Sequence, residues 1–515
     1  MKRLNGVVAA GHSETADAAV EILKAGGNAF DAVIAAMLAA CVAEPVLASP
    51  GGGGFLTARA EGRSPQVYDF FAHTPKRKQP LEDLDFYPIE ANFGTARQTF
   101  HIGLGSIATP GFIRGLFLIH QHHCRLPLSE LFQPAITLAR EGVVLNHFQS
   151  LITQIIGPIL RATPAVMSLN ESPANPGQLI TEGELHRQPD LADFFDALQH
   201  GGERLFYNGE AGQQLVRDCK TQGGLLQMED LNDYQVILRA PLQLNYRGTE
   251  LFTNPLPSLG GTLIAFSLGL MAENSSQTST SDPESSLRQL ARCMKLTQQV
   301  RQERFDSMAQ ILNPDIAKAY HRQMDNGGLS TRGTTQISIA DTQGNLASMT
   351  LSNGEGCGYI IPQSGIMMNN MLGEEDLNPG GFNHWQENSR LASMMSPTLI
   401  IERNGDALVT GSGGSNRIRS AVLQIILNHI DHHMPLDAAV SKPRIHYENG
   451  LLSIEPGYDE AACHALLDEF PEQQLWKRKN LFFGGAHSVI LKSNGILEGS
   501  GDERRGGVWR QLFNR

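Results

Sequence analysis

The chain has 515 residues, a formal net charge of −12 and a pI near 5.8; 41% of its residues are hydrophobic and 18% are charged. This composition predicts a soluble globular protein, and the acidic balance argues against nucleic acid or an anionic membrane as the main partner. The richest apolar run, residues 32–48, contains Glu44 and Pro45 and is too short to span a bilayer. Six scattered cysteines without paired spacing are typical of free thiols, and the chain does not open on a signal-peptide pattern, so we expect a cytoplasmic protein.

Residues 13–42 are predicted to form two helices. Ser13 is a suitable N-cap for the first helix, whose apolar residues recur at helical spacing up to the stop at Gly26 and Gly27. The second helix begins at an Asn/Asp-containing turn and is apolar on nearly every side, as expected of a core helix. Further on, the pattern predicts a glycine turn with two short strands at 50–71, and helical segments around 111–142 and 189–220.

The central part of the chain changes from strands to helices. Residues 233–257 alternate like strands, and the Pro and Gly residues that follow lead into an apolar helix ending near residue 271. Residues 273–286 are of low complexity and predict a mobile surface loop. A helical stretch is expected at 287–323.

From residue 334 onward the pattern is mainly that of strands. Residues 334–351 predict a hairpin whose turn, 341–345, places Gly344 at a left-handed position. This order of elements suits an α+β layered sandwich in which one segment begins at Thr334. The remaining predicted strands lie at 359–370, 397–411, 452–457 and 488–500, with helices at about 417–432 and 458–469.

The junction between Gly333 and Thr334 allows two interpretations. A threonine pair at the start of a strand is most often structural, because β-branched residues favour strands. Alternatively, Thr334 is a latent N-terminal nucleophile. Gly333 tolerates the strained backbone that attack of a hydroxyl on the preceding carbonyl requires, and the Gly-rich loop upstream is suited to cleavage.

A series of motifs favours the second interpretation. The motifs are GGNAFDAVIAA, PGGGGF, PLPSLGGTLIAF, TTQISIADTQGN, SGIMMNNMLGEEDLNP, SMMSPTLI, GSGGSNRI and PRIHYE. They follow one another in the order found in the γ-glutamyltransferases, and the chain resembles this family of N-terminal nucleophile hydrolases over nearly its whole length. The resemblance implies a four-layer αββα sandwich with additional helices from the N-terminal segment. It also implies cleavage between Gly333 and Thr334 into segments 1–333 and 334–515, which together form one intertwined domain.

The resemblance implies that the Thr334 hydroxyl serves both self-cleavage and turnover. A threonine hydroxyl is a weak nucleophile that needs a neighbouring base. Once Thr334 is N-terminal, its own α-amine, with an ordinary pKa of about 7.7–8.0, can accept the proton directly or through a water. The β-methyl group restricts χ1 and holds the hydroxyl in one direction.

Residues 350–358 follow the hairpin and are implied to support the nucleophile. The family has a hydroxyl near the nucleophile's amine, which either Thr350 or Ser352 could supply, and an Asn that holds the substrate, for which Asn353 is the candidate. A Gly-rich exit from a strand would explain the same residues without any catalytic role.

Residues 369–379 combine two side-chain amides with three carboxylates. The resemblance implies an acid here that receives the substrate α-ammonium; Glu374 is the direct match and Asp376 its neighbour. Asn370 is expected at the substrate as well. Asn369 and Asn370 are also good turn formers, which alone could explain one of them.

Two further motifs are implied to contact the acyl group. Ser393 matches the first of two serines that the family directs at the substrate α-carboxylate, but the second position is Met394, which cannot donate a hydrogen bond. The glycine turn that follows leads into a helix. Backbone N–H groups of Gly413, Gly414 or Ser415 are suitably placed there to stabilise an oxyanion, with Ser415 also near the substrate.

Phe71 departs most clearly from the family pattern. The family usually has an Arg at this position, which grips the substrate α-carboxylate bidentately, and losing it together with one serine removes most of that clamp. Lys76, Arg77 or Arg417 are candidates to replace it. Acyl-enzyme chemistry is therefore better supported than γ-glutamyl specificity.

We expect a self-processing enzyme that cleaves γ-glutamyl amides such as glutathione through an ester on Thr334 and transfers the acyl group to water, an amino acid or a peptide. One alternative is an acylase-type hydrolase acting on another acyl group, dicarboxylyl or cephalosporin-type. The other is an uncut, catalytically silent relative with a binding role.

No cofactor is expected. The histidine pairs at 121–124 and 431–434 lack a matching set of metal ligands, and no nucleotide-binding motif is present. The expected partners are a small-molecule amide substrate and, for each processed segment, the other segment of the same chain. A homo-oligomer is left open.

Overall fold

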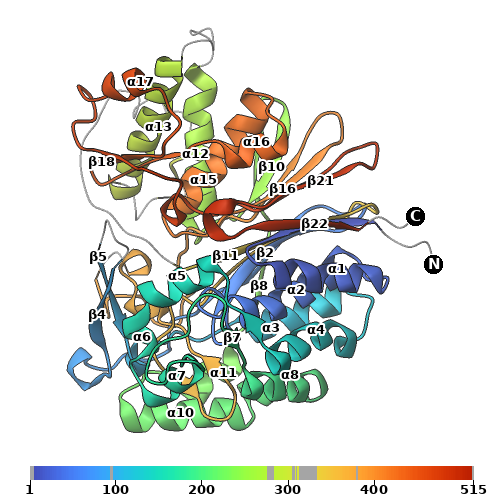
Figure 1. Ribbon diagram of the computed structural model, residues 1–515, viewed down its shortest axis with the longest axis vertical. Coiled ribbons are helices and arrows are strands. Elements are labelled where there is room, and N and C mark those ends of the chain that lie inside the picture. Colours follow the sequence, from blue (N-terminus) through green and yellow to red (C-terminus); the bar gives the residue numbers. More distant parts are fainter. Residues whose placement is uncertain are drawn as a thin grey trace.

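Two β-sheets stacked face to face lie at the centre of the molecule, and helices cover the outer face of each (Figure 1). The computed structural model describes residues 5–92, 97–274, 283–303, 308, 310–312, 333–378 and 381–512. The layers follow the order helix, sheet, sheet, helix, and they confirm the predicted α+β sandwich. Within the described ranges, no helix is both long and apolar enough to cross a bilayer.

Both sheets are antiparallel, and both mix strands from before and after residue 333. The first sheet has seven strands in the order β22 (Val508–Leu512), β1 (Gly6–Ala10), β11 (Thr335–Asp341), β12 (Leu346–Ser352), β2 (Gly53–Arg59), β3 (Gln66–Phe70) and β8 (Ile237–Arg239). The second has six, in the order β21 (Leu497–Ser500), β20 (Ser488–Leu491), β16 (Ala407–Thr410), β15 (Thr398–Ile401), β10 (Thr249–Thr253) and β9 (Leu242–Tyr246).

The helices fall into three groups. The first sheet is covered by α1 (Ser13–Lys24), α2 (Ala29–Ala43), α3 (Phe112–His123), α4 (Leu128–Glu141) and α8 (Pro189–Gly201). The second is covered by α12 (Leu259–Asn274), α13 (Pro283–Glu303), α15 (Arg417–Ile426) and α16 (Leu436–Ser441). The other helices are α5 (His147–Ile155), α6 (Gly157–Leu160), α7 (Pro164–Leu169), α9 (Arg204–Tyr207), α10 (Glu210–Gln222), α11 (Met228–Asp233) and α17 (Glu460–His464).

The remaining strands form small sheets outside the sandwich. They are β4 (Tyr87–Asn92) with β5 (Arg97–Ile102), β6 (Val143–Val144) with β7 (Leu185–His186), β13 (Ile360–Ile361) with β14 (Ile366–Met367), and β17 (Ile445–Glu448) with β18 (Leu451–Ile454) and β19 (Gln473–Leu475).

The space between the two sheets is partly apolar and partly polar. Val7, Val409 and their neighbours form a small apolar core there. Toward the Thr334 end, buried hydroxyl groups replace it: Ser338 donates to the His487 carbonyl and Ser348 to the Thr410 carbonyl, both at 2.7 Å. Each hydroxyl has a partner, as burial requires, so this end of the sandwich can hold polar groups.

Helix α2 is fixed to both ends of strand β11. All 15 of its residues are buried, as its apolar pattern predicts. At its start, the Asp341 carboxylate of the hairpin turn accepts a hydrogen bond from the Ala29 N–H at 2.9 Å. Just after its end, Glu44 accepts one from the Thr335 hydroxyl at 2.7 Å. These contacts hold the residue next to Thr334 against a buried helix.

Most predicted elements are confirmed, including the two helices of 13–42, the helix after 254 and the hairpin with Gly344 at φ +91°. The prediction for Ser13 is wrong: His12 is the N-cap, and its Nδ1 accepts from the Glu14 N–H at 3.1 Å. The predicted loop 273–286 is shorter than expected, because helix continues to Asn274 and resumes at Pro283; residues 275–282 lie outside the described ranges. The helix predicted at 287–323 is confirmed as far as Glu303, and residues 304–307, 309 and 313–323 also lie outside them.

Candidate active site

The register of the β11–β12 hairpin brings Thr334 next to Ser352. The strands pair so that Thr335 faces Leu351 and Gln336 faces Thr350. Extended by one residue, this register places Thr334 opposite Ser352. Successive side chains of a strand point to opposite faces, so the two hydroxyls lie on the same face of the sheet.

The peptide group between Gly333 and Thr334 is held by buried side chains. The Thr334 hydroxyl donates to the Gly333 carbonyl oxygen at 2.8 Å, and the Ser352 hydroxyl donates to the same oxygen at 2.9 Å. The Gly333 N–H donates to the Glu355 carboxylate at 2.8 Å. Ser352 Oγ also accepts from the Gly354 N–H at 3.1 Å, which orients its proton toward the carbonyl. Two hydroxyl groups thus meet at one carbonyl group.

A cavity of about 30 Å³ lies beside Thr334, which is room for one or two water molecules. Glu374 is the one charged side chain that lines it within the described ranges. The other polar side chains in its wall are Thr334, Ser352, Ser393 and Ser415, and the apolar ones are Phe71, Leu259, Met371, Leu377, Ala392, Met394, Met395 and Ile418. Residues from distant parts of the sequence therefore meet beside Thr334.

Phe71 and Met394 make the wall of this cavity apolar. Phe71 is 1% exposed and stacks on Phe55, with 5.4 Å between ring centroids. Met394 is 7% exposed and lies beside Ser393, whose hydroxyl accepts from the Met395 N–H at 3.0 Å.

None of the three predicted substitutes for the missing Arg lines the cavity. Lys76 and Arg77 form ion pairs with acidic residues of α11 and its C-terminal neighbourhood, away from the cavity. Arg417 is buried, but its Nε donates to the Phe482 carbonyl at 3.1 Å and its guanidinium lies over the Phe482 ring. The wall therefore has no cationic side chain within the described ranges.

The glycine turn before α15 approaches Thr334 closely. A Cβ atom on Gly413 would lie 2.0 Å from the Thr334 carbonyl oxygen, so only glycine fits there. The Gly413 N–H already donates to the Gly485 carbonyl at 3.2 Å, which leaves Gly414 and Ser415 as the candidate oxyanion donors. Ser415 has φ +53°, a left-handed conformation that is costly for a residue other than glycine and typical of functional sites.

Besides Gly413 and Gly414, three predicted site residues lie outside the cavity wall. The Thr350 hydroxyl donates to Gln336 Oε1 at 2.6 Å, within the polar layer between the sheets. Asn353 Nδ2 donates to the Met367 carbonyl at 3.4 Å, and Asn370 Oδ1 accepts from the Glu355 N–H at 3.0 Å. Asn370 thus positions the residue that holds Gly333. The side chain of Asp376, the alternative to Glu374, lies outside the described residues.

Sequence reasoning missed two buried charges at the junction. Glu355 lies in the same motif as Asn353. A carboxylate within a Gly-rich run could have identified it as a candidate site residue. Arg505 donates from Nη1 to the Thr334 carbonyl oxygen at 3.4 Å, although it follows 171 residues later. Burial and the nearby Arg417 charge lower the pKa of Arg505 to about 9, while Asp502 and Glu355 oppose this shift.

Glu44, which anchors Thr335, should make stability depend on pH. Burial raises the pKa of Glu44 to about 7, and the hydrogen bonds from Thr335 and Thr15 oppose the shift only in part. The folded state then holds this proton more tightly than the unfolded state. The contribution of Glu44 to the free energy of unfolding is therefore complete below about pH 4.5. It falls by up to about 1.4 kcal/mol per pH unit as the pH rises toward 7.

This dependence can be measured by urea denaturation between pH 4.5 and 7.5 in a chain made uncleavable by Thr334→Ala. We expect Glu44→Gln to flatten the decline, because glutamine keeps one acceptor oxygen and does not titrate. Glu61→Gln, which changes an exposed carboxylate, is the matched control. An equal decline in the Glu44→Gln chain would contradict the prediction.

Comparison with known proteins identifies the family. The model of the Gamma-glutamyltranspeptidase family matches residues 15–511. The chain belongs to this family. Curated relatives of this γ-glutamyltranspeptidase family member include the glutathione hydrolase proenzyme of Pseudomonas aeruginosa, 29% identical over 86% of this chain and 83% of the relative. The glutathione hydrolase proenzyme of Escherichia coli is 27% identical over 97% and 90%. The Acylase ACY 1 proenzyme of Pseudomonas sp. strain SE83 is 27% identical over 98% and 93%.

These relatives show that the family member is an enzyme of the γ-glutamyltransferase or acylase type. Glutathione hydrolases and an acylase match it at nearly the same identity, so overall similarity does not separate the two activities.

Solved structures agree on the fold. A cephalosporin acylase from Bacillus halodurans superposes with a TM-score of 0.86 at 23% identity, over 99% of this chain and 96% of that one. A γ-glutamyltranspeptidase from Pseudomonas nitroreducens superposes with a TM-score of 0.51 at 26% identity, over 62% of this chain and 94% of that one. The family member therefore has the N-terminal nucleophile hydrolase fold.

Proposed function

We propose that this family member cuts its own chain between Gly333 and Thr334 and then uses Thr334 as the nucleophile of an amide hydrolase or acyltransferase. The observation that carries the proposal is the pair of hydroxyls, Thr334 Oγ at 2.8 Å and Ser352 Oγ at 2.9 Å, on the Gly333 carbonyl oxygen.

Self-cleavage begins when Thr334 Oγ attacks the Gly333 carbonyl carbon and closes a five-membered ring. The Ser352 hydroxyl stabilises the negative oxygen that forms. The Gly333–Thr334 C–N bond breaks, the hydroxyl proton passes to the departing nitrogen, and an ester remains on Thr334. Water then hydrolyses this ester, which leaves a carboxylate on Gly333 and a free amine and hydroxyl on Thr334.

Turnover repeats the same chemistry on a substrate amide. The Thr334 amine takes the proton of its own hydroxyl as the oxygen attacks the substrate carbonyl carbon. That proton goes to the leaving amine, and the acyl group stays on Thr334 as an ester. Water or an acceptor amine then attacks the ester and restores the hydroxyl. The N–H groups of Gly414 and Ser415 are the candidate oxyanion donors.

The side chains beside Thr334 support one class of acyl group. Glu374 supplies a carboxyl group, and no cationic side chain lines the wall within the described ranges. An acyl group with an ammonium at the γ-glutamyl α-nitrogen position can pair with Glu374. A carboxylate in the same place would face Phe71 and Met394, with only serine hydroxyls to hold it. The site thus favours an amine-bearing acyl group whose carboxylate is absent or masked.

Other acyl groups fit this wall less well. A γ-glutamyl group keeps its ammonium contact but leaves its α-carboxylate poorly solvated. A dicarboxylyl group brings a second carboxylate toward Glu374, which like-charge repulsion disfavours. The cytoplasmic location stays a prediction.

Ser352 and Thr350 offer a matched pair of variants that tests the cleavage mechanism. Removing the hydroxyl in Ser352→Ala should slow self-cleavage by about 10²–10³-fold, the usual effect of losing one oxyanion donor. Thr350→Val, two residues away in the polar layer, should leave the rate nearly unchanged. The rate is measured by denaturing gel electrophoresis of freshly synthesised chain. Equal rates in both variants, or a native chain that stays uncut and inactive, would contradict the proposal.

A further inference from the structure

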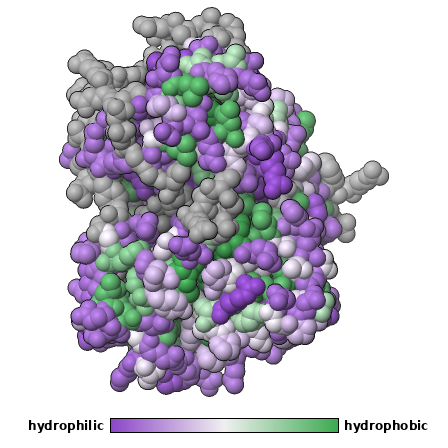
Figure 2. All heavy atoms as spheres, turned by 60° about the vertical axis from the view of Figure 1, so that its left-hand side comes forward, coloured by the Kyte–Doolittle hydropathy of each residue, from purple (hydrophilic) through white to green (hydrophobic). Residues whose placement is uncertain are grey.

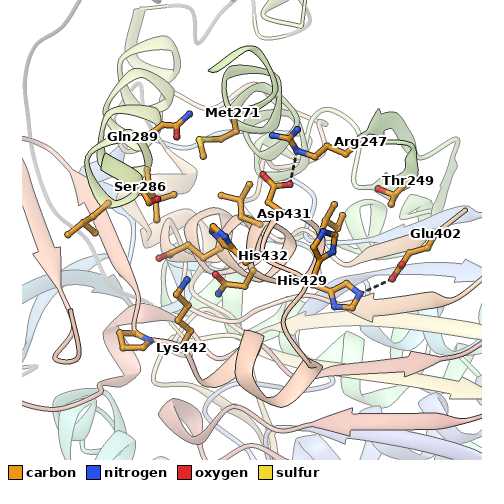
Figure 3. Close-up of a pocket in the computed structure, with 18 of the residues that line it drawn as sticks. Arg247, Thr249, Met271, Ser286, Gln289, Glu402, His429, Asp431, His432 and Lys442 are labelled. Atoms are coloured by element: carbon orange, nitrogen blue, oxygen red, sulfur yellow. Dashed lines mark hydrogen bonds and ion pairs between the residues drawn. The ribbon is translucent and has the colours of Figure 1, made fainter. Parts of the chain in front are cut away.

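A second cavity, of about 870 Å³, lies on the helical side of the second sheet, away from Thr334 (Figure 3). Its wall includes Met271 of α12, Leu287 and Leu290 of α13, and residues 427–433, which follow α15. Ile418 of α15 lines the nucleophile cavity, and eleven residues of helix separate it from His429, a distance of about 16 Å. The volume is within the usual range of small-molecule sites, about 300–1,000 Å³.

The backbone beside this cavity is irregular in two places. Residues Leu427–Asp431 form a π-helical turn directly after α15, and all five line the cavity. His433, two residues further on, has φ +51°. π-Turns and left-handed non-glycine residues are costly and occur often at functional sites. The histidine pair at 432–433 thus belongs to the wall of a cavity.

Among the described residues, two acidic side chains line the cavity wall, and each has a partner. Glu402 contacts His429 Nε2 at 2.8 Å, and Asp431 accepts from Arg247 Nε at 2.8 Å (Figure 3). Asp431 also accepts from the Tyr246 hydroxyl at 2.7 Å. Both carboxylates therefore have a hydrogen-bond or ion-pair partner before any ligand enters. The other ionisable nitrogen-bearing side chains of the described wall are Arg403, His432, His433 and Lys442.

Lys442 is the basic group best placed for a ligand. Its backbone is fixed, because its N–H donates to the Ala438 carbonyl at 3.0 Å and its carbonyl accepts from Arg504 at 2.8 Å. Its ammonium has no hydrogen bond or ion pair with another residue of the described ranges. Figure 3 shows the amine directed toward His432 across the cavity floor. Partial burial lowers the pKa of Lys442, as expected of a cation that lacks a partner anion.

We propose that this cavity binds a small organic carboxylate with an apolar body. Lys442 and His432 hold the carboxylate by charge-assisted hydrogen bonds, and Leu287, Leu290 and Ile430 pack against the apolar part. The protein has a net charge of −12, so Lys442 and His432, beside the apolar side chains of this mixed wall, are a local feature that overall charge does not explain. This site is independent of the chemistry at Thr334.

Calorimetric titration of the full-length protein with 4-phenylbutyrate, octanoate and the neutral amide 4-phenylbutyramide tests the proposal. At least one carboxylate should bind at millimolar concentration or below, and 4-phenylbutyramide should bind at least about 10-fold more weakly than 4-phenylbutyrate. Lys442→Gln should reduce carboxylate affinity by a similar factor and leave amide affinity unchanged. Lys76→Gln, at a surface lysine paired with Asp233, is the matched control and should bind like the native protein.

A second variant keeps the test informative if Lys442→Gln does not fold. Ile430→Trp should fill part of the cavity and weaken the carboxylate and the amide alike, with amide hydrolysis at Thr334 unchanged. A photoreactive octanoate analogue should label peptides that contain residues 286–290, 427–433 or 442. Failure of both carboxylates to bind, equal carboxylate affinity in Lys442→Gln, or labelling elsewhere would overturn the proposal.

Discussion

Replacing Thr334 by alanine should leave the chain in one piece and abolish amide hydrolysis. The variant lacks the hydroxyl that lies 2.8 Å from the Gly333 carbonyl oxygen, and without cleavage no N-terminal amine is released to act as the base. We expect the rate of hydrolysis to fall by about 10⁴-fold or more, as for other enzymes that lose their nucleophile. Denaturing gel electrophoresis and mass spectrometry should show native fragments 1–333 and 334–515 and a single uncut variant.

Two further variants, one at Thr334 and one at the adjacent Thr335, test whether the Thr334 hydroxyl itself is the nucleophile. Thr334→Ser keeps the hydroxyl and should still be cut, more slowly, because it lacks the methyl group that restricts χ1. Thr335→Val removes the adjacent hydroxyl, which is bound to Glu44, and should be cut at Gly333 like the native chain. Cleavage of Thr334→Ala at the same bond would show that another group is the nucleophile.

The second large expected effect is on the preference for an acyl group. It can be measured as kcat/KM for four anilides whose acyl groups differ only in the substituents on one carbon. The γ-glutamyl anilide carries both amine and carboxylate, 4-aminobutanoyl only the amine, glutaryl only the carboxylate, and butanoyl neither. Because Glu374 is the sole charged side chain in the described wall of the cavity, 4-aminobutanoyl should have the highest kcat/KM. We expect it to exceed glutaryl by about 30-fold or more, equivalent to about 2 kcal/mol of charge pairing.

Variants at the cavity wall should reorder this series. Glu374→Gln should remove the advantage of the amine and bring 4-aminobutanoyl down to the level of butanoyl. Phe71→Arg should raise kcat/KM for the γ-glutamyl anilide, because a guanidinium can pair with its α-carboxylate. Phe71→Met is the matched control, since it also replaces the ring by a long unbranched side chain but adds no charge.

A clear preference of the native enzyme for glutaryl would contradict the role of Glu374. A preference for the γ-glutamyl anilide over 4-aminobutanoyl would instead show that serine hydroxyls suffice to hold the carboxylate. Neither result would affect the assignment of Thr334, which depends on cleavage and not on the choice of acyl group.

The sequence of the β11–β12 hairpin is enough to predict which residue lies opposite Thr334. Asp341 and Gly344 predict the turn at 341–345, and equal steps outward from it place Thr334 opposite Ser352. Counting residues from the turn therefore favours Ser352 over Thr350 as the neighbour of the nucleophile. The alternation of side chains in a strand is a local property, which is why the sequence contains this information.

The sequence by itself determined the hairpin, the buried helix α2, the glycine turn at Gly413 and the missing Arg at Phe71. Each follows from short-range periodicity or from a motif. The tertiary structure alone decided that Glu355 and Arg505 hold the two sides of the Gly333–Thr334 bond, and that Arg417 is turned away to Phe482.

The two cavities also depend on the tertiary structure, because sheets and helices from distant parts of the chain form their walls. Figure 2 shows one face of the resulting surface. Whether a side chain points into such a cavity depends on which layers pack together and on which buried polar groups need hydrogen-bond partners. The periodicity of a single segment does not predict these contacts between distant segments. The place of Thr334 opposite Ser352 could therefore be predicted from the sequence, whereas the charges that surround it are set only by the folding of the whole chain.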